Sequence, residues 1–410
     1  METLRSLCLS LAKFTRNLVA AVPENQSQAY ENEPSIRQLL RHYTSYTEIS
    51  KGESYTATRI LTQTLANIVT SNEDLIEKLW NSYLRRVIST PDAGTALASF
   101  VLILNCLHGS LPRMAFLTTS LSGPRLCITY LDRMASLFDA ADGESTGAFE
   151  IGYRIFSDWV EGDLIPAIYT RIGIAEEVVT PHHTTLLKLL DAYLQPSNRG
   201  HINASRQCLW RLCEMTTTVF FSLGDYTQQS IQRALGSYKT QQLEELDLLL
   251  PKVCEALVLV TQCLISLTLF SEEEFVFCYL CSPTYRAPST EHVSFLPETL
   301  RLLDRFLPRI ALGKVAPPPA ADPKGFSYLK RDLVRLLGIL VADRPAVQDR
   351  TRNCGGIPVI LNLCVMDDRN PYLREHAIFA LRNLLHGNLE NQALVKEIQP
   401  LEDWENPIVG

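Results

Sequence analysis

The chain has 410 residues, of which 46% are hydrophobic and 20% are charged. A single hydrophobic core stops growing near ~250–300 residues, so a chain of this length requires several domains or a stack of repeats. Lys and Arg number 38 against 45 Asp and Glu, and no run of basic residues occurs. This balance argues against nucleic acid as a partner.

The cysteines and the N-terminus favour a cytoplasmic protein. Eleven cysteines are scattered without a framework, and several lie in apolar runs such as 101–107, where they act as small hydrophobic residues. Residues 4–18 are apolar at helical spacing but include three basic residues, which a secretory signal lacks. A mitochondrial presequence stays open, because no acidic residue occurs between Glu2 and Glu24.

Apolar residues recur at three- and four-residue steps, which predicts amphipathic helices, and the alternation typical of strands is nearly absent. In chain order the clearest predicted helices are 36–46, 55–69, 75–87, 96–107, 185–194, 207–221, 243–270, 296–312, 328–340 and 372–385. The most apolar stretch, 256–270, is shorter than the ~20 residues of a membrane span and contains Gln262, so we expect a buried helix. The predicted fold class is all-α.

Internal repetition narrows the choice of helical fold. Arg16-Asn17-Leu18 followed by Glu24-Asn25-Gln26 matches Arg382-Asn383-Leu384 followed by Glu390-Asn391-Gln392, at one spacing and 366 positions apart (383 − 17). Weaker copies surround Asn67 and Asn105, which lie 38 residues apart (105 − 67). That interval is close to the ~40–47 residues of armadillo and HEAT repeats. Residues 111–310 show helical periodicity without clean copies.

The last repeat shows how one unit is built. Gly355-Gly356 predicts a sharp turn, Asn370 with Pro371 predicts a helix start, and Gly387 predicts a helix end. Between them, Ala377, Ala380, Leu381, Leu384 and Leu385 share one helix face. One such unit cannot bury its apolar face alone, so we expect an armadillo/HEAT-like right-handed α-solenoid, with an unrelated helical bundle as the alternative.

A proline-rich stretch marks a boundary. Pro317-Pro318-Pro319 cannot be helical, so 313–326 is predicted to be a linker or loop. It separates armadillo-like repeats at 1–312 from a C-terminal domain at 327–410.

Four asparagines occupy one place in the repeat and are the candidate binding residues: Asn17, Asn67, Asn105 and Asn383. An asparagine amide carries both donor and acceptor groups, so it could bind the backbone of an extended partner in a groove. The alternative is that these amides bond neighbouring backbone and hold the stack together, as most side-chain hydrogen bonds do.

Other motifs have structural explanations. Gly143–Gly147 matches the G-x-S-x-G pattern around Ser145, but a nucleophile elbow needs a strand before it, and here a helix precedes. Cys278 and Cys281 form a lone C-x-x-C without a second ligand pair. We expect Cys208 and Cys213 on different faces of an apolar helix, and His182-His183 at a helix start, so we predict no metal site. No nucleotide or cofactor motif occurs.

The C-terminal block 328–399 resembles the C-terminal domain of the ataxin-10 family, including fungal homologues of which one is labelled a copper transport protein. The residues that carry the resemblance are Arg335-Leu336-Leu337-Gly338, Val347-Gln348-Asp349, Gly355-Gly356-Ile357-Pro358, Asp367-Asp368, Asn370-Pro371, Arg374-Glu375-His376-Ala377-Ile378 and Arg382-Asn383-Leu384. Ile339 departs from the repeat, since an asparagine is expected there. No ligand cluster supports copper transport.

The resemblance implies a cytoplasmic, armadillo-like scaffold that is not an enzyme, and a family role in cytokinesis or signalling. Family members are associated with cell division, neuronal survival, a glycosyltransferase and G-protein β subunits. We therefore expect other proteins as partners, with no cofactor, no nucleic acid and no membrane span, and homo-oligomerisation left open. The alternatives are a transport-receptor-like armadillo adaptor and a serine hydrolase that uses Ser145.

Overall fold

The computed structural model describes residues 2–48, 51–82, 93–138, 140, 142–237, 247–270, 328–366 and 372–398. Within these ranges all regular secondary structure is helical, which confirms the predicted all-α class. By internal packing the chain divides into two compact units, Met1–Leu189 with His201–Leu212 and Leu190–Gly200 with Cys213–Gly410.

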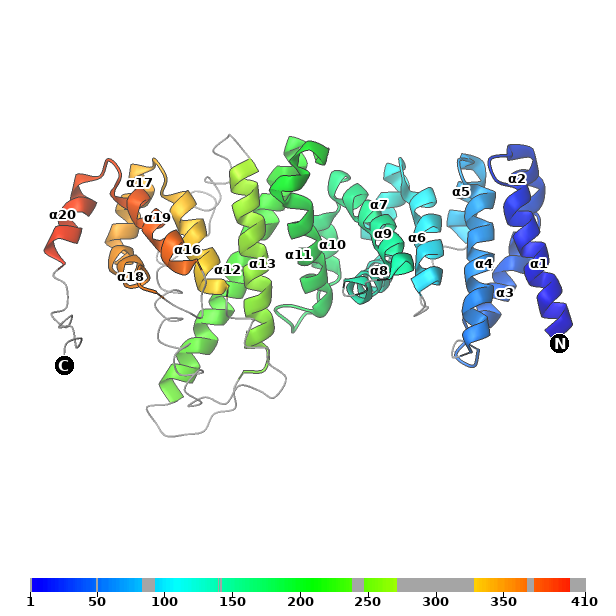
Figure 1. Cartoon of the computed structure of the whole chain (residues 1–410), viewed down its shortest axis with the longest axis horizontal. Helices are drawn as coiled ribbons and strands as arrows, with labels where there is room; N and C mark the ends of the chain where they lie inside the picture. The colour runs from blue at the N-terminus through cyan, green and yellow to red at the C-terminus, as the bar shows by residue number, and fades with distance from the viewer. Residues whose placement is uncertain are drawn as a thin grey trace, which may run out of the picture. The chain divides into compact units, whose positions relative to one another are not determined.

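The first unit contains ten α-helices entirely within its described residues, drawn from blue to green in Figure 1. They are α1 (Glu2–Leu18), α2 (Pro23–Tyr30), α3 (Glu33–Tyr43), α4 (Gly52–Val69), α5 (Glu73–Ser82), α6 (Ala93–Leu107), α7 (Leu111–Thr119), α8 (Gly123–Leu137), α9 (Gly143–Glu161) and α10 (Ile165–Arg171). Helices α11 (Pro181–Leu194) and α12 (Arg206–Ser237) have residues in both units.

The second unit continues with α-helices that Figure 1 colours from yellow-green to red. They are α13 (Leu250–Phe270), α16 (Leu329–Leu340), α17 (Pro345–Asn353), α18 (Gly356–Asn362), α19 (Leu373–Leu385) and α20 (Leu389–Glu397). A short 3-10 helix, η1, spans Pro196–His201.

One helix-turn-helix joint recurs along both units. In each joint a helix ends, a residue with positive φ follows, and the next helix begins two residues later. These left-handed residues are Ala21, Ser71, Gly109, Asp163, Asp343 and Gly387, with φ between 52° and 72°. The next helices begin at Pro23, Glu73, Leu111, Ile165, Pro345 and Leu389. A left-handed residue after a helix is a common way to end it, and two of the six are glycine, for which the conformation carries no Cβ penalty.

The joint defines a common register. We call the residue four positions before each left-handed residue the ladder position, and the helix that contains it a ladder helix. The ladder positions hold Asn17, Asn67, Asn105, Trp159, Ile339 and Asn383. The ladder helices are α1, α4, α6, α9, α16 and α19. Asn17 and Asn383 therefore occupy like positions in their local units, as the sequence repeat predicts.

Ladder helices pack against one another in chain order within each unit. In the first unit α4 packs against α1, α6 against α4, and α9 against α6, and α4 also contacts α3. In the second unit α19 packs against α16 and α18, and α16 packs against α13. Of the five residues predicted on one face of α19, three are fully buried, Ala377, Ala380 and Leu384, whereas Leu381 and Leu385 are half-buried.

The region 111–171 contains a repeat whose ladder position lacks asparagine. Helices α7 to α10 keep the register of the joint, but its ladder position holds Trp159, not asparagine. The Trp159 ring packs against Tyr130, with ring centroids 4.5 Å apart, and Tyr130 packs against Phe100 at 5.5 Å. Aromatic packing replaces the amide at this position, so the sequence signature is lost while the geometry is kept.

Helix α13 begins at Leu250, later than the predicted helix 243–270, because residues 247–249 are not helical; 243–246 lie outside the described residues. By length and composition it could cross a membrane, as could the pair Gly94–Leu107 and Leu111–Thr119 taken together, although that pair is bent by 112°. The apolar window of α13 is 67% buried inside the protein. Gln262 Nε2 also donates to Asp332 Oδ2 of α16 at 3.0 Å. Core helices of soluble proteins meet the same criteria of length and composition. Because most of the apolar window of α13 is buried, we interpret α13 as a core helix.

Several predictions lie outside the described residues. These are the linker 313–326, the helix 296–312, the pair Cys278 and Cys281, and the helix start at Asn370-Pro371. The domain boundary near 313–326 therefore stays a prediction.

Candidate partner-binding surface

Three of the four candidate asparagines donate to the preceding ladder helix. Asn67 Nδ2 donates to the backbone oxygen of Arg16 at 3.0 Å, and Asn383 Nδ2 donates to that of Gly338 at 2.9 Å. Asn105 Nδ2 lies 3.3 Å from the backbone oxygen of Ala66 and 2.9 Å from Thr70 Oγ1.

Each acceptor carbonyl belongs to the residue just before the ladder position of the preceding ladder helix. Arg16 precedes Asn17, Ala66 precedes Asn67, and Gly338 precedes Ile339. The three amides thus make equivalent contacts with the backbone of a neighbouring helix. This is the structural role that the sequence offered as the alternative to partner binding. Each amide uses at least one of its N–H groups within the chain, and any binding role of Asn67, Asn105 or Asn383 stays a proposal.

Close packing accompanies the bond from Asn383. A Cβ added at Gly338 would lie 3.2 Å from the Cβ of Ala380, so only small residues allow this approach of α16 and α19. Ile339 cannot donate from the ladder position of α16. Asn17 is exposed; its Oδ1 accepts from Arg16 Nε at 3.3 Å, and no ladder helix precedes α1 among the described residues.

Gln26 forms a second kind of joint, a buried network of side-chain hydrogen bonds between α2 and the end of α4, which we call the glutamine joint. Its side chain is only 1% exposed. Its Nε2 donates to the backbone oxygens of Asn67 at 3.1 Å and Thr70 at 3.0 Å. Its Oε1 accepts from Asn72 Nδ2 at 3.1 Å. A buried amide is thereby satisfied on both its donor and its acceptor side.

Gln348 of α17 forms the same joint in the second unit, and it too is 1% exposed. Its Nε2 donates to the backbone oxygens of Asn383 at 2.9 Å and His386 at 3.3 Å, and also to that of Val341 at 3.2 Å. Its Oε1 accepts from Asn388 Nδ2 at 3.2 Å.

Three hydrogen bonds of the two joints match atom for atom, and Gln348 adds the bond to Val341. The partners of Gln348 lie 316 residues after those of Gln26 (383 − 67, 386 − 70 and 388 − 72). Sequence reasoning assigned no role to either glutamine. The signal was present, however, since both follow a ladder position by nine residues (26 − 17 and 348 − 339).

Ser145, the alternative nucleophile, is part of a helix cap. Asp142 caps α9: its Oδ1 accepts from the Ser145 backbone N–H at 2.9 Å and its Oδ2 accepts from Ser145 Oγ at 2.6 Å. These hydrogen bonds lower the pKa of Asp142. The chain enters this cap from helix α8, not from the strand that a nucleophile elbow requires. Ser145 is 3% exposed, so its hydroxyl is not presented to solvent.

A structural role explains the contacts of Cys208, Cys213, His182 and His183. Burial raises the pKa of the Cys208 and Cys213 thiols to about 12, so these groups stay protonated, and Cys208 Sγ contacts the backbone oxygen of Val160 at 2.8 Å. His182 and His183 diverge as predicted. His182 Nε2 lies 2.9 Å from Asp132 Oδ1, and His183 Nε2 lies 2.9 Å from the backbone oxygen of Tyr169. Over the part of the chain that the structure describes, no group of His, Cys, Asp and Glu could hold a metal ion.

The exposed large apolar side chains include one set on α1 and another in the C-terminal block. On α1 they are Leu7, Leu11, Phe14 and Leu18. On and next to α19 they are Tyr372, Ile378 and Phe379, and Tyr328 is exposed just before α16, with the Arg331 guanidinium 4.4 Å from its ring centroid. Aromatic and Arg side chains are over-represented among the residues that anchor protein interfaces.

Comparison with known proteins concerns the C-terminal part of the chain. Residues 329–408 match the family described as "Spinocerebellar ataxia type 10 protein domain". The chain is 45% identical to the ataxin-10 homolog of Dictyostelium discoideum over 79 residues, which are 19% of this chain and 12% of that protein. It is 38% identical to the Saccharomyces cerevisiae ataxin-10 homolog over 18% of this chain and 13% of that protein. Bovine ataxin-10 is 39% identical over 17% of this chain and 15% of that protein.

The matched part thus spans less than a sixth of the length of these relatives. An engineered protein of known structure aligns over 94% of this chain and 96% of its own, but with a TM-score of 0.30 and 12% identity. The matched block contains α16 to α20, and therefore Gln348, Asn383 and the joint between them. Residues 329–408 thus match the ataxin-10 family, which confirms the resemblance seen in the sequence.

Proposed function

We propose that this chain is a non-enzymatic protein-binding scaffold of the ataxin-10 type, built as a right-handed armadillo-like α-solenoid and working in the cytoplasm. The observation that carries the proposal is the identity of the joints around Gln26 and Gln348. The recurring polar groups connect helix to helix, as repeat proteins require of neighbouring units, and they form no reaction centre. A chain built this way offers extended surface to partners.

In the ataxin-10-type domain we propose that a partner contacts the exposed side chains of Tyr328, Tyr372, Ile378 and Phe379. These side chains are large and exposed in the folded unit, so binding a protein there would remove apolar area from water. We propose this surface for the family-type partners, and a role in cytokinesis or signalling through them.

Proximity labelling with the full chain tests the scaffold role. Cells that express the wild-type fusion are compared through the cell cycle with cells that express Phe379→Asp. The matched control is Leu121→Asp, because Leu121 is 97% exposed and lies in the first unit. We expect specific neighbours that Phe379→Asp loses and Leu121→Asp keeps. A wild-type chain without reproducible neighbours in any phase contradicts the scaffold proposal.

A single substitution tests the hydrolase alternative. Ser145→Ala removes the hydroxyl that donates to Asp142 but keeps the backbone cap. We expect helical content unchanged, a stability loss of about 0.5–1 kcal/mol, and no change in any ester or peptide hydrolysis by the purified chain. If the wild-type chain hydrolyses a substrate and this variant does not, the result would support the serine hydrolase hypothesis.

The transport-receptor-like adaptor has less support. That reading needs ladder asparagines that are available to an extended peptide. Asn67, Asn105 and Asn383 already donate to neighbouring helices, and the ladder positions of α9 and α16 hold Trp159 and Ile339.

A further inference from the structure

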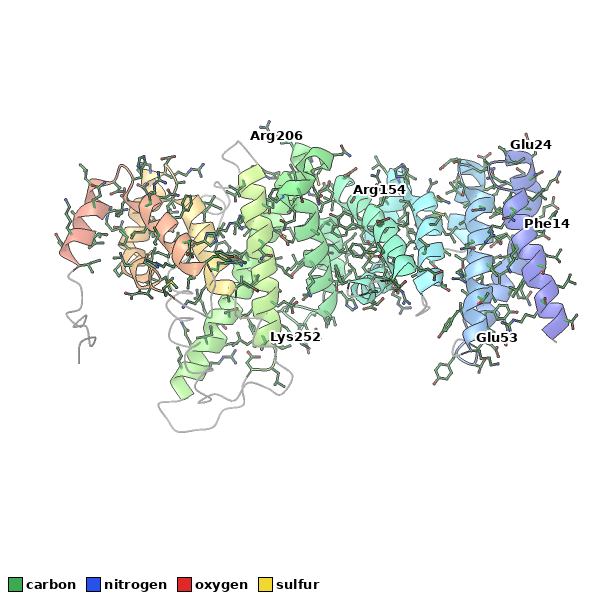
Figure 2. All side chains as sticks on the ribbon, in the orientation of Figure 1. Phe14, Glu24, Glu53, Arg154, Arg206 and Lys252 are labelled. Carbon is green, nitrogen blue, oxygen red and sulfur yellow. The ribbon has the colours of Figure 1, made fainter. Side chains whose placement is uncertain are left out.

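Helix α1 has an apolar stripe that the fold leaves uncovered. Leu7, Leu11, Phe14 and Leu18 are between 49% and 64% exposed. Their spacing of four, three and four residues places them on one face of the helix. Figure 2 shows Phe14 on the side of α1 that is turned away from α4. A contiguous stripe of this kind, unlike scattered exposed residues, indicates an interaction site.

The same four positions are buried in the other ladder helices that hold asparagine or isoleucine. Counting from the ladder position, the equivalents are Ala57, Leu61, Thr64 and Ile68 in α4; Thr95, Ser99, Leu102 and Cys106 in α6; Leu329, Leu333, Leu336 and Leu340 in α16; and Leu373, Ala377, Ala380 and Leu384 in α19. All sixteen are at most 6% exposed. In α9 the equivalents Phe156 and Val160 are fully buried, while Phe149 and Tyr153 are half-buried.

Neighbouring helices cover this stripe wherever it is buried. Thr64 Oγ1 in the stripe of α4 donates to the backbone oxygen of Ala12 in α1 at 3.0 Å, and Ala380 in the stripe of α19 packs against Gly338 of α16. The stripe is therefore the face by which a ladder helix joins the helices before it. Helix α1 has the sequence and register of a ladder helix, and its uncovered stripe continues the interface that its equivalents form.

Asn17 lies beside the stripe, and its hydrogen bonding supports the same conclusion, that a further helix can pack here. Its equivalents in α4, α6 and α19 donate to a backbone carbonyl of the preceding ladder helix. The hydrogen bond of Asn17 is one that it accepts, from Arg16. A helix placed against the stripe would bring a carbonyl to this amide, whereas a lipid surface would offer no such ordered acceptor.

The charges on α1 indicate what kind of partner helix would fit against the stripe. No Asp or Glu occurs between Glu2 and Glu24. Arg5 pairs with Glu53 and Arg16 Nη1 donates to Gln63 Oε1 at 2.6 Å, so both are engaged with α4. Lys13 is exposed on the polar side of the helix, next to the exposed Ser6, Ser10 and Asn17. An occupant with acidic residues along one edge would complement this side.

We propose that the Leu7–Leu11–Phe14–Leu18 stripe of α1 docks one amphipathic helix of a partner protein, with an aliphatic face and an acidic flank. This helix takes the place that a preceding ladder helix has in the other units. The inference rests on the proposed scaffold function and specifies one surface and one class of partner for it. Only four large side chains are covered, so the complex belongs with small, transient interfaces, and we expect a Kd in the micromolar range.

Binding of designed helical peptides to the full chain tests the proposal. One fluorescent peptide carries a leucine stripe flanked by glutamate, and a second carries the same stripe flanked by lysine. We expect the glutamate peptide to bind at least tenfold more tightly, and Lys13→Glu to reduce this preference. Phe14→Asp should weaken its binding at least tenfold, Asn17→Ala should weaken it about threefold to tenfold, and Leu121→Asp should leave it unchanged.

Other results overturn the proposal in distinguishable ways. Equal binding of both peptides contradicts the acidic flank of the proposed partner helix, and binding insensitive to Phe14→Asp removes the assigned surface. Phosphatidylserine vesicles that bind wild type but not Phe14→Asp, while peptides fail, would assign the stripe to membranes. Self-association in sedimentation that Phe14→Asp abolishes would assign it to a second copy. In proximity labelling, a Phe14→Asp chain that keeps every wild-type neighbour defeats the docking site but leaves the scaffold function standing.

Discussion

Burial raises the pKa of Asp191 to about 6, because its carboxylate is largely removed from water. A hydrogen bond from Gln195 Nε2, at 3.1 Å, lowers the pKa, and the negative charge of Asp332 raises it. The folded pKa lies above the ordinary value of 3.8, so the folded state binds this proton more tightly than the unfolded chain does. The stability contributed by this group is full below pH ~4 and is lost as the pH rises through about 6.

Replacing Asp191 by asparagine therefore has an effect that depends on pH. We expect Asp191→Asn to stabilise the second unit by about 1–2 kcal/mol at pH 7.5, after allowance for partial solvent exposure, and by much less at pH 4. The asparagine Oδ1 can still accept from Gln195. Urea unfolding followed by circular dichroism at both pH values measures the effect, with the exposed Asp225→Asn as control. An equal gain at both pH values would contradict the ionisation argument.

At the scale of the elements, stability depends on amides that join one helix to the next. Gln26 satisfies two carbonyl groups and one amide at the end of α4, in a site that water does not reach. Removing one member of such a network leaves buried polar groups unpaired, which costs more than the bond itself contributes.

Gln26→Ala is expected to lower the stability of the first unit by about 2–3 kcal/mol. Gln38, exposed on the adjacent α3, provides the control, and Gln38→Ala should change stability by no more than about 0.5 kcal/mol. Hydrogen exchange should show faster amide exchange at the end of α4 and at α5 in Gln26→Ala alone. Unchanged protection there would show that the joint does not hold these helices together.

At the scale of the whole molecule, the proposed solenoid makes a prediction about size. A compact globular protein of 410 residues has a radius of gyration of about 22 Å. Repeats that stack along one direction give a larger value, because each contacts only its neighbours. We expect small-angle X-ray scattering of the purified monomer to give a radius of gyration well above that of the globule. A value near 22 Å would contradict the solenoid.

The amino-acid sequence by itself determined the helical class and the register of the repeat. Periodicity located α3, α4, α6, α11, α16 and α19, because each buries an apolar stripe at helical spacing. The asparagines at the ladder position identified equivalent units 366 residues apart, and Gly387 marked a helix end through its conformational freedom. The dense motifs of the C-terminal block were enough to indicate the ataxin-10 family.

Only the tertiary structure decided what those side chains do. An asparagine amide can bind a partner or a neighbouring helix, and the spacing of residues is the same in both cases. The repeat between α7 and α10 was hidden because Trp159 replaces the amide with ring packing, which follows no sequence motif. The stripe on α1 occupies the same repeat positions as its buried equivalents. Its exposure depends on which helices are present to cover it, and a local sequence does not contain that information.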